Sequence, residues 1–201
     1  MMQSDGRILK GEETLRKILE SALVIISNKG LVGISAASVA QQAGVSKSNI
    51  FHHFKSVDNL SEAILKRVME SMEHSLDASK FKTVKSYLMA LGEAIIQVAG
   101  EQLPVYRVFL SFYHESLFNE NYRKMIDQFL ELTKVKLISD LKVIIKDHLS
   151  DKLIQSIATL IITTLDGIGL HVLLGGSPKT YLEVWKLQVD SISEFIRGGF
   201  Q

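Results

Sequence analysis

Apolar residues recur at intervals of three and four along most of the chain, which is the period of an amphipathic α-helix. This spacing predicts helices near residues 12–28, 36–42, 46–51, 57–76, 84–102, 104–117, 120–148, 152–173 and 180–196. No segment shows the strict alternation of apolar and polar residues that indicates a half-buried strand. The only two prolines, Pro104 and Pro178, fall at boundaries of predicted helices. The pattern therefore predicts an all-α fold of about nine helices.

The composition narrows the class of protein. Apolar residues make up 46% of the chain, which is enough to bury a core. The absence of cysteine excludes disulfides and thiolate zinc sites and suits a reducing cytoplasm. The most apolar stretch, residues 153–174, carries Gln155, Asp166 and His171, so we expect a buried protein helix rather than a membrane span. A soluble, cytoplasmic protein that does not contact membranes is predicted.

Charge is unevenly distributed along the chain. Residues 1–60 contain seven Lys and Arg against five Asp and Glu, whereas residues 61–201 contain sixteen against seventeen. This asymmetry gives weak support for a first third that faces DNA.

Two short helices joined by a tight turn are predicted between residues 35 and 51. Gly44 can adopt the positive φ of such a turn, and Val39, Val45 and Ile50 can form a small core beneath it. The second helix would then expose Lys47, flanked by polar residues that can reach base edges or phosphates. The alternative is a generic corner of a helical bundle, but such a corner does not require exposed polar residues between serine caps. A helix-turn-helix that enters the major groove is therefore predicted.

Residues 39–46, 51–56 and Leu60 resemble the DNA-binding signature of the TetR family. The likeness covers about residues 12–68 and includes Gly30 and the first predicted helix. It implies a three-helix DNA-binding domain at residues 1–56, a linking helix at 57–76, and an effector-binding and dimerisation domain at 77–201. The family favours Tyr where this chain has Phe51, and Lys is common at Val57, so two contacts to the DNA backbone are expected to be missing.

The helix-turn-helix and the resemblance together predict the contacts to double-stranded DNA. Adjacent side chains on a helix face different directions, so His52 and His53 favour contact with the DNA backbone over a metal site. Residues 33–37 superficially resemble a nucleophile elbow but lack its preceding strand. We therefore predict no enzyme activity, no cofactor and no metal. The residues expected at the DNA are Ser35, Ala36, Ser46, Lys47, Ser48, Asn49, Phe51, His52, His53 and Lys55.

Aromatic residues gather in the C-terminal part of the chain, where they can form either ordinary core or the wall of a ligand cavity. The resemblance to the TetR family implies an effector site there. Few polar groups accompany the aromatic residues, so a mostly apolar or amphipathic small molecule is expected. Asp166 can cap such a cavity, pair across a dimer interface or be satisfied locally. The residues expected to bind the ligand are Met69, Met72, Leu91, Ile95, Phe109, Phe112, Tyr113, Phe129 and Asp166.

The last two predicted helices carry apolar stripes that can pair with a second copy of the chain. Two-fold symmetry of a homodimer would require a roughly palindromic operator. The alternative is that both stripes face the core of their own subunit. The residues expected at the dimer interface are Ile161, Thr164, Ile168, Leu182, Trp185, Val189 and Ile192.

The function expected from these features is that of a dimeric repressor that a small molecule releases from its operator. A DNA-binding protein of the same family that is regulated by protein contacts, without a small effector, is the competing hypothesis. An enclosed cavity in the C-terminal part of the chain would favour the first over the second.

Overall fold

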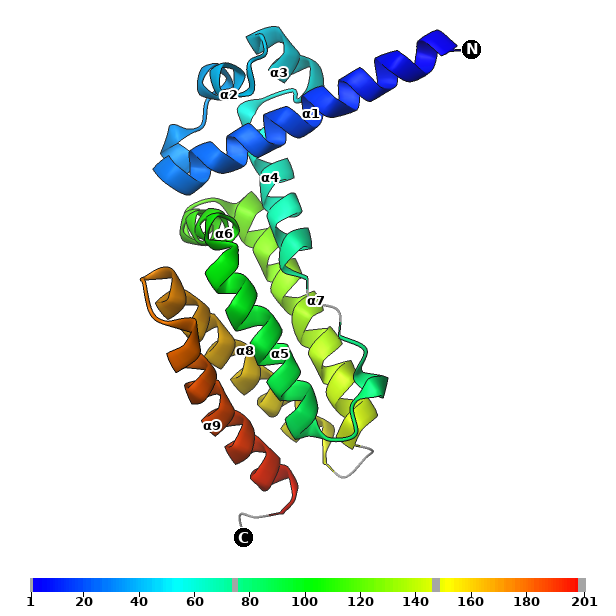
Figure 1. Ribbon diagram of the computed structural model, residues 1–201, viewed down its shortest axis with the longest axis vertical. Helices are drawn as coiled ribbons and strands as arrows, with labels where there is room; N and C mark the ends of the chain where they lie inside the picture. The colour runs from blue at the N-terminus through cyan, green and yellow to red at the C-terminus, as the bar shows by residue number, and fades with distance from the viewer. Residues whose placement is uncertain (1, 74–75, 146–148, 199–201) are drawn as a thin grey trace. The chain divides into compact units, whose positions relative to one another are not determined.

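The computed structural model describes residues 2–73, 76–145 and 149–198, and every regular element in these ranges is a helix (Figure 1). The prediction of an all-α fold is confirmed. Within the described residues, nine α-helices are accompanied by two single 3₁₀ turns, η1 (Leu31–Gly33) and η2 (Ala78–Lys80). The α-helices are α1 (Met2–Lys29), α2 (Ala36–Ala43), α3 (Lys47–His53), α4 (Val57–Met72), α5 (Val84–Glu101), α6 (Leu103–Glu115), α7 (Glu120–Ile145), α8 (Asp151–Leu173) and α9 (Pro178–Ile196).

Helix ends differ from the sequence prediction where the local signals were weak. Helix α1 begins at Met2, ten residues before the predicted start at residue 12, because no proline interrupts residues 2–11 and isolated glycines are tolerated inside a helix. Helix α4 ends at Met72, before the predicted end at Leu76. Helix α9 begins at Pro178, since proline is favoured in the first helical turn. The end of α7 predicted at residue 148 lies outside the described residues.

The chain divides into two compact units. The first contains Met1–Met72 and Pro104–Ile126, and the second contains Glu73–Leu103 and Asp127–Gln201. Helix α6 and the start of α7 thus group with the N-terminal helices, although the sequence assigned them to the C-terminal domain. The functional domain boundaries at residues 56 and 76 stay a prediction.

The first unit is built on α1, which packs against α2 and α4. Ile18 and Ala22 of α1 are completely buried, as are Leu60 and Ile64 of α4. Within the same unit, the ring of Phe112 meets the edge of Tyr122 with centroids 5.1 Å apart, and the two planes are inclined at 78°. This aromatic pair gives the unit a large, well-filled core.

The second unit is built on α5, which runs beside α8 and α9 (Figure 1). The indole of Trp185 on α9 is completely buried, and its Nε1–H donates a hydrogen bond of 2.8 Å to the carbonyl oxygen of Leu88 on α5. Gly92, one turn further along α5, leaves space for the indole: a Cβ at this position would lie 1.9 Å from Nε1 of Trp185. The close packing of α5 against α9 therefore depends on the absence of a side chain at Gly92.

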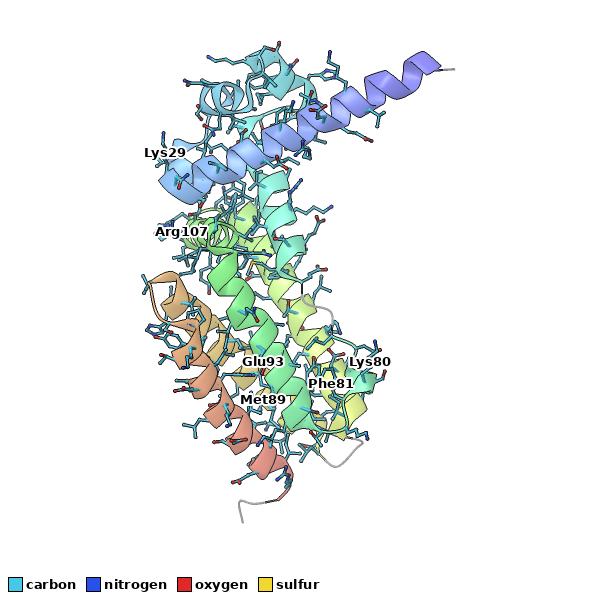
Figure 2. All side chains as sticks on the ribbon, viewed as in Figure 1. Lys29, Lys80, Phe81, Met89, Glu93 and Arg107 are labelled. Carbon is cyan, nitrogen blue, oxygen red and sulfur yellow. The ribbon has the colours of Figure 1, made fainter. Side chains whose placement is uncertain are left out.

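A second side-chain network joins α5 to α7. The hydroxyl of Tyr87 donates to Oδ2 of Asp140 at 2.7 Å, and Nζ of Lys136 lies 2.8 Å from the same oxygen. The ring of Phe81, labelled in Figure 2, meets the edge of the Tyr87 ring at 5.4 Å. Burial, with the nearby carboxylate, raises the pKa of the Tyr87 hydroxyl, so this group stays protonated and acts as a donor.

Helix α8 is long and apolar enough to cross a membrane by length and composition alone, with a mean hydropathy of 1.6. In the structure, however, eight of its residues are buried inside the chain, from Ile154 to Val172. Contacts with α5 and α9 cover this face of α8. The burial fits the interpretation of α8 as a core helix of the second unit.

Candidate nucleic-acid interface and effector cleft

Helix α2 begins in a reciprocal capping box. The backbone N–H of Ser38 donates to Oγ of Ser35 at 3.0 Å, and the backbone N–H of Ser35 donates to Oγ of Ser38 at 2.9 Å. Two N–H groups that the helix itself cannot satisfy thereby find acceptors. The first turn of α2 is fixed by local hydrogen bonds.

The turn between α2 and α3 depends on Gly44, which has a φ of 65° and a ψ of 34°. This left-handed conformation ends α2, and the backbone N–H of Val45 donates to the carbonyl oxygen of Ala40 at 3.0 Å. Ser46 then caps α3, since its Oγ accepts from the backbone N–H of Asn49 at 3.3 Å. The two helices are therefore connected by three residues, as the sequence predicted.

A small buried cluster holds α2 and α3 together. Val39 and Ile50 are completely buried and Ala40 nearly so, while Val45 is half-buried. Ile50 is the buried residue of α3, so it anchors that helix to the unit. Burial of Ile50 directs the neighbouring side chains of α3 outward.

The structure brings together all of the residues predicted to contact DNA. Ser35 and Ala36 lie at the start of α2, and the others lie in α3 or within two residues of its ends. All of them are exposed except Ala36 and His53, which are half-buried. The rings of His52 and His53 meet edge to face at 5.3 Å. Their individual roles at DNA stay predictions.

The residues predicted to bind an effector fall in both units. In the first unit, Phe112 and Met69 are core residues and Tyr113 is exposed. In the second unit, Leu91 is buried in α5. Met72, Phe109, Ile95 and Phe129 are half-buried. Phe112 is committed to the aromatic pair with Tyr122, so its role in the structure is that of core.

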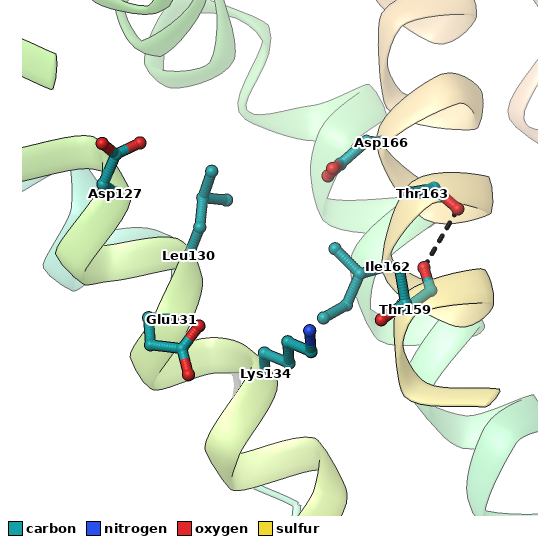
Figure 3. A pocket seen from close by; sticks show the side chains of 8 residues that line it. All are labelled: Asp127, Leu130, Glu131, Lys134, Thr159, Ile162, Thr163 and Asp166. Carbon is teal, nitrogen blue, oxygen red and sulfur yellow. Dashed lines mark hydrogen bonds between the residues drawn. The ribbon is translucent and has the colours of Figure 1, made fainter. Parts of the chain in front are cut away.

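Asp166 is the predicted ligand residue that lines a cleft within one unit (Figure 3). The cleft lies between α7 and α8 and has a volume of about 430 Å³. Three carboxylates, one ammonium, two hydroxyls and two aliphatic side chains line it. These are Asp127, Leu130, Glu131 and Lys134 of α7, and Thr159, Ile162, Thr163 and Asp166 of α8.

The side chain of Asp166 is exposed at the surface of α8, where neighbouring atoms partly shield its carboxylate from water. Burial raises the pKa of Asp166, which means that its surroundings disfavour the charged form. The hydroxyl of Thr163 is occupied by the carbonyl oxygen of Thr159 at 3.0 Å, shown by the dashed line in Figure 3. Asp166 and the Thr163 hydroxyl therefore lie on the same wall, and only the hydroxyl has a hydrogen bond drawn in this cleft.

Sequence reasoning missed the contribution of α7 to this cleft. Asp127, Leu130, Glu131 and Lys134 are spaced by three, one and three residues, so they share one face of the helix. A face of this composition is normally solvated, which is why the pattern alone did not suggest a site. The sequence signal for this site is Asp166, an acidic residue within the apolar middle of α8, which was noted as a possible cap of a cavity.

The predicted dimer interface needs correction. Ile161, Ile168, Trp185, Val189 and Ile192 are buried inside their own subunit, so their side chains cannot meet a second copy. Thr164 and Leu182 are half-buried. The apolar stripe read from the sequence is the one that faces the core, which was the stated alternative.

A different apolar stripe is exposed on the same two helices. On α8 it passes through Leu160, Gly167 and Leu170, and on α9 it passes through Val184 and Leu187. The intervals of three, seven and ten residues place each set on one helix face. Gly167 adds a point where a neighbouring backbone can approach closely, because a Cβ there would have no atom within 4 Å.

The comparison with known sequences identifies the N-terminal helices. Residues 18–64 match the family of bacterial regulatory proteins named after tetR. The HTH-type transcriptional regulator BetI of Burkholderia lata is 26% identical over 180 residues, which cover 88% of this chain and 90% of that protein. BetI of Paraburkholderia xenovorans is 25% identical over 165 residues, which cover 81% and 83%.

Solved structures share the fold over almost the full length. A transcriptional regulator from Pseudomonas aeruginosa aligns with a TM-score of 0.71 at 20% identity, covering 92% of this chain and 93% of that one. A regulator from Saccharomonospora viridis, determined in complex with choline, aligns with a TM-score of 0.69 at 20% identity, covering 89% and 94%. With the capped α2, the Gly44 turn and the exposed polar face of α3, the match over residues 18–64 identifies the N-terminal helices as a DNA-binding domain of the TetR type, and the chain as a whole is similar to transcriptional regulators.

Proposed function

We propose that the chain is a dimeric repressor in the cytoplasm that a small molecule releases from a palindromic operator. The α2–turn–α3 arrangement carries the DNA-binding part of this proposal, because a capped, anchored helix with an exposed polar face fits the major groove. Selection of bound sequences from random DNA tests it. Enrichment of a two-fold symmetric site is expected, and enrichment of no sequence would contradict it.

The exposed stripes of α8 and α9 support the proposed dimer. Leucine side chains exposed at helical intervals on two adjacent helices lose solvent contact when a second copy covers them, which favours association. A symmetric pair would place four helices, two from each subunit, at the interface. Two copies of α3 would then bind two half-sites.

Leu187→Glu is expected to convert the protein into a monomer. Leu187 is 70% exposed in the single subunit, so the substitution leaves the fold intact, but a carboxylate in a dimer interface would have no partner. An uncompensated buried charge costs about 3–5 kcal/mol. Sedimentation at micromolar concentration should show monomer, and operator affinity should fall. Leu132→Glu on α7 is the matched control, since Leu132 is 69% exposed and lies outside α8 and α9. If the Leu187 variant remained a dimer, the proposal that the subunits associate through this face would be wrong.

The cleft between α7 and α8 is open to solvent rather than enclosed, since five of its eight lining residues are exposed, and we take it as the site at which a small molecule would act. Its volume lies in the range of small-molecule sites. Three carboxylates and one ammonium line the cleft, so its lining carries more negative than positive charge. A ligand with a positive charge therefore fits it better than the mostly apolar ligand expected from the sequence. The related fold from Saccharomonospora viridis binds choline, a small organic cation. A ligand that binds the DNA-free state more tightly would lower operator affinity.

Asp166→Asn is expected to abolish most of the response to such a ligand while leaving operator binding intact. Choline and primary amines would be added to the protein–operator complex, and DNA release measured by fluorescence anisotropy. Because the raised pKa of Asp166 means that its ionised form destabilises the fold, the asparagine variant should be at least as stable at neutral pH. Asp151→Asn, at the start of α8 and outside the cleft, is the control. An equal response of both variants to the ligand would exclude this cleft as the effector site.

A further inference from the structure

Helix α3 exposes one large apolar side chain among its polar ones. Phe51 is 52% exposed, whereas the adjacent Ile50 is completely buried. Lys47 and Ser48 precede Phe51 by four and three residues, so all three side chains share one face of the helix. The phenyl ring therefore lies on the face that carries the polar groups proposed to meet DNA.

The position of this ring is fixed by the packing of the helix. Ile50 anchors α3 to the core, Ser46 caps its start, and the backbone N–H of Phe54 donates to the carbonyl oxygen of Ile50 at 2.8 Å at its end. Successive side chains of a helix are turned by about 100° from one another. Burial of Ile50 thus turns Phe51 away from the core.

The chemistry of the ring limits what it can recognise. A phenyl group neither donates nor accepts a hydrogen bond, so it cannot read the donors and acceptors on base edges. The major groove displays one apolar group, the 5-methyl of thymine. Since half of the ring is exposed to water in the free protein, covering it with a methyl group would be favourable.

We propose that Phe51 selects a thymine in each half-site by contact with its 5-methyl group. This inference rests on the proposed binding of α3 in the major groove and adds a base preference to it. Lys47 on the same face remains available for phosphates or polar base edges, whereas the Ser48 hydroxyl shares a hydrogen bond of 2.7 Å with the hydroxyl of Ser46.

The test removes methyl groups from the DNA without altering its hydrogen bonds. In the selected operator, each thymine is replaced singly by deoxyuridine, and affinity is measured by fluorescence anisotropy at fixed salt. One position per half-site should lose about fourfold in affinity, which is the effect of about 0.8 kcal/mol for one buried methyl-sized group. Uniform affinity across all deoxyuridine operators would overturn the proposal.

Three variants separate methyl contact from other roles of the residue. Phe51→Ala should bind the thymine and deoxyuridine operators equally, whereas Phe51→Tyr, which keeps the ring, should retain the preference. Lys55→Ala should weaken binding to all sequences and also keep the preference. A preference that survives in Phe51→Ala would show that the ring packs elsewhere, for example on the sugar–phosphate backbone. Failure of the unaltered protein to bind any specific site would instead overturn the proposed function.

Discussion

Gly92→Ala is expected to destabilise the protein by several kcal/mol, although it adds a single methyl group. The new Cβ would lie 1.9 Å from Nε1 and 2.1 Å from Cδ1 of Trp185, closer than any two such atoms can approach. The indole is completely buried and cannot turn away freely. Overpacking costs about 1–3 kcal/mol. Loss of the hydrogen bond from Nε1 to Leu88 leaves a buried donor unpaired, at a further cost of about 1–3 kcal/mol.

Urea unfolding followed by circular dichroism and by the fluorescence of the single tryptophan would measure this loss. Gly11→Ala is the matched control, because Gly11 also lies inside a helix but a Cβ there would have no atom within 4 Å. Alanine is favoured over glycine in a helix by about 1 kcal/mol, so this variant should be slightly stabilised. Similar stabilities of the two variants would show that α5 and α9 shift apart at little cost.

Ile50→Ala is expected to cost about 2–5 kcal/mol of stability, because it leaves a cavity beneath α3. Operator binding should fail at temperatures where the variant is partly unfolded. The neighbouring Asn49→Ala should behave differently. Asn49 is exposed, and its backbone N–H, which alanine retains, donates the capping hydrogen bond to Oγ of Ser46. Its stability should change by less than about 0.5 kcal/mol.

DNA binding distinguishes the two variants further. If Asn49 reads a base edge, Asn49→Ala should lose about 1–3 kcal/mol of affinity for the specific site and little for random DNA. Ile50→Ala, measured at a temperature where it is folded, should keep the ratio of specific to random binding. Thermal unfolding and anisotropy on both DNAs give these quantities. Equal loss on both DNAs in the Asn49 variant would assign Asn49 to the backbone rather than to a base.

The sequence predicted the fold well where a residue type permits few conformations. Gly44, flanked by apolar residues and followed by a serine cap, specified the turn, and the resemblance to the TetR family fixed the order of the helices around it. Element ends were less certain because helix propensity near residues 2–11 and 74–76 offers no stop signal. In the part of the chain that the structure describes, nine α-helices lie close to the predicted ranges.

Periodicity could not show which face of α8 is exposed, for a specific reason. Helix α8 carries apolar residues on more than one face, since both Leu160 and the adjacent Ile161 are aliphatic. Periodicity shows that a helix has an apolar stripe, but it does not show which of two stripes the rest of the chain covers. Contacts of α8 with α5 and α9 decide this, and they bury Ile161 and leave Leu160 exposed.

The proposed effector cleft was missed because it depends on two helices far apart in the sequence. Asp127 and Glu131 have the spacing of a solvated face, and only the folded chain places Asp166 of α8 across the cleft from them. Conversely, Phe112 was expected to contact a ligand because aromatic residues line many cavities. Its ring instead packs against the edge of the Tyr122 ring. Residue type alone does not separate a core aromatic from a ligand contact.

If the chain dimerises as proposed, the exposed leucines of α8 and α9 would also determine how occupancy of an operator responds to the amount of protein in a cell. When most of the protein is monomeric, the concentration of the proposed dimer rises with the square of the total concentration. Doubling expression would then raise the dimer about fourfold, so repression would begin over a narrow range of protein level. Substitutions that tighten the contact at Leu160 or Leu187 would make the response more gradual and shift its onset to lower expression.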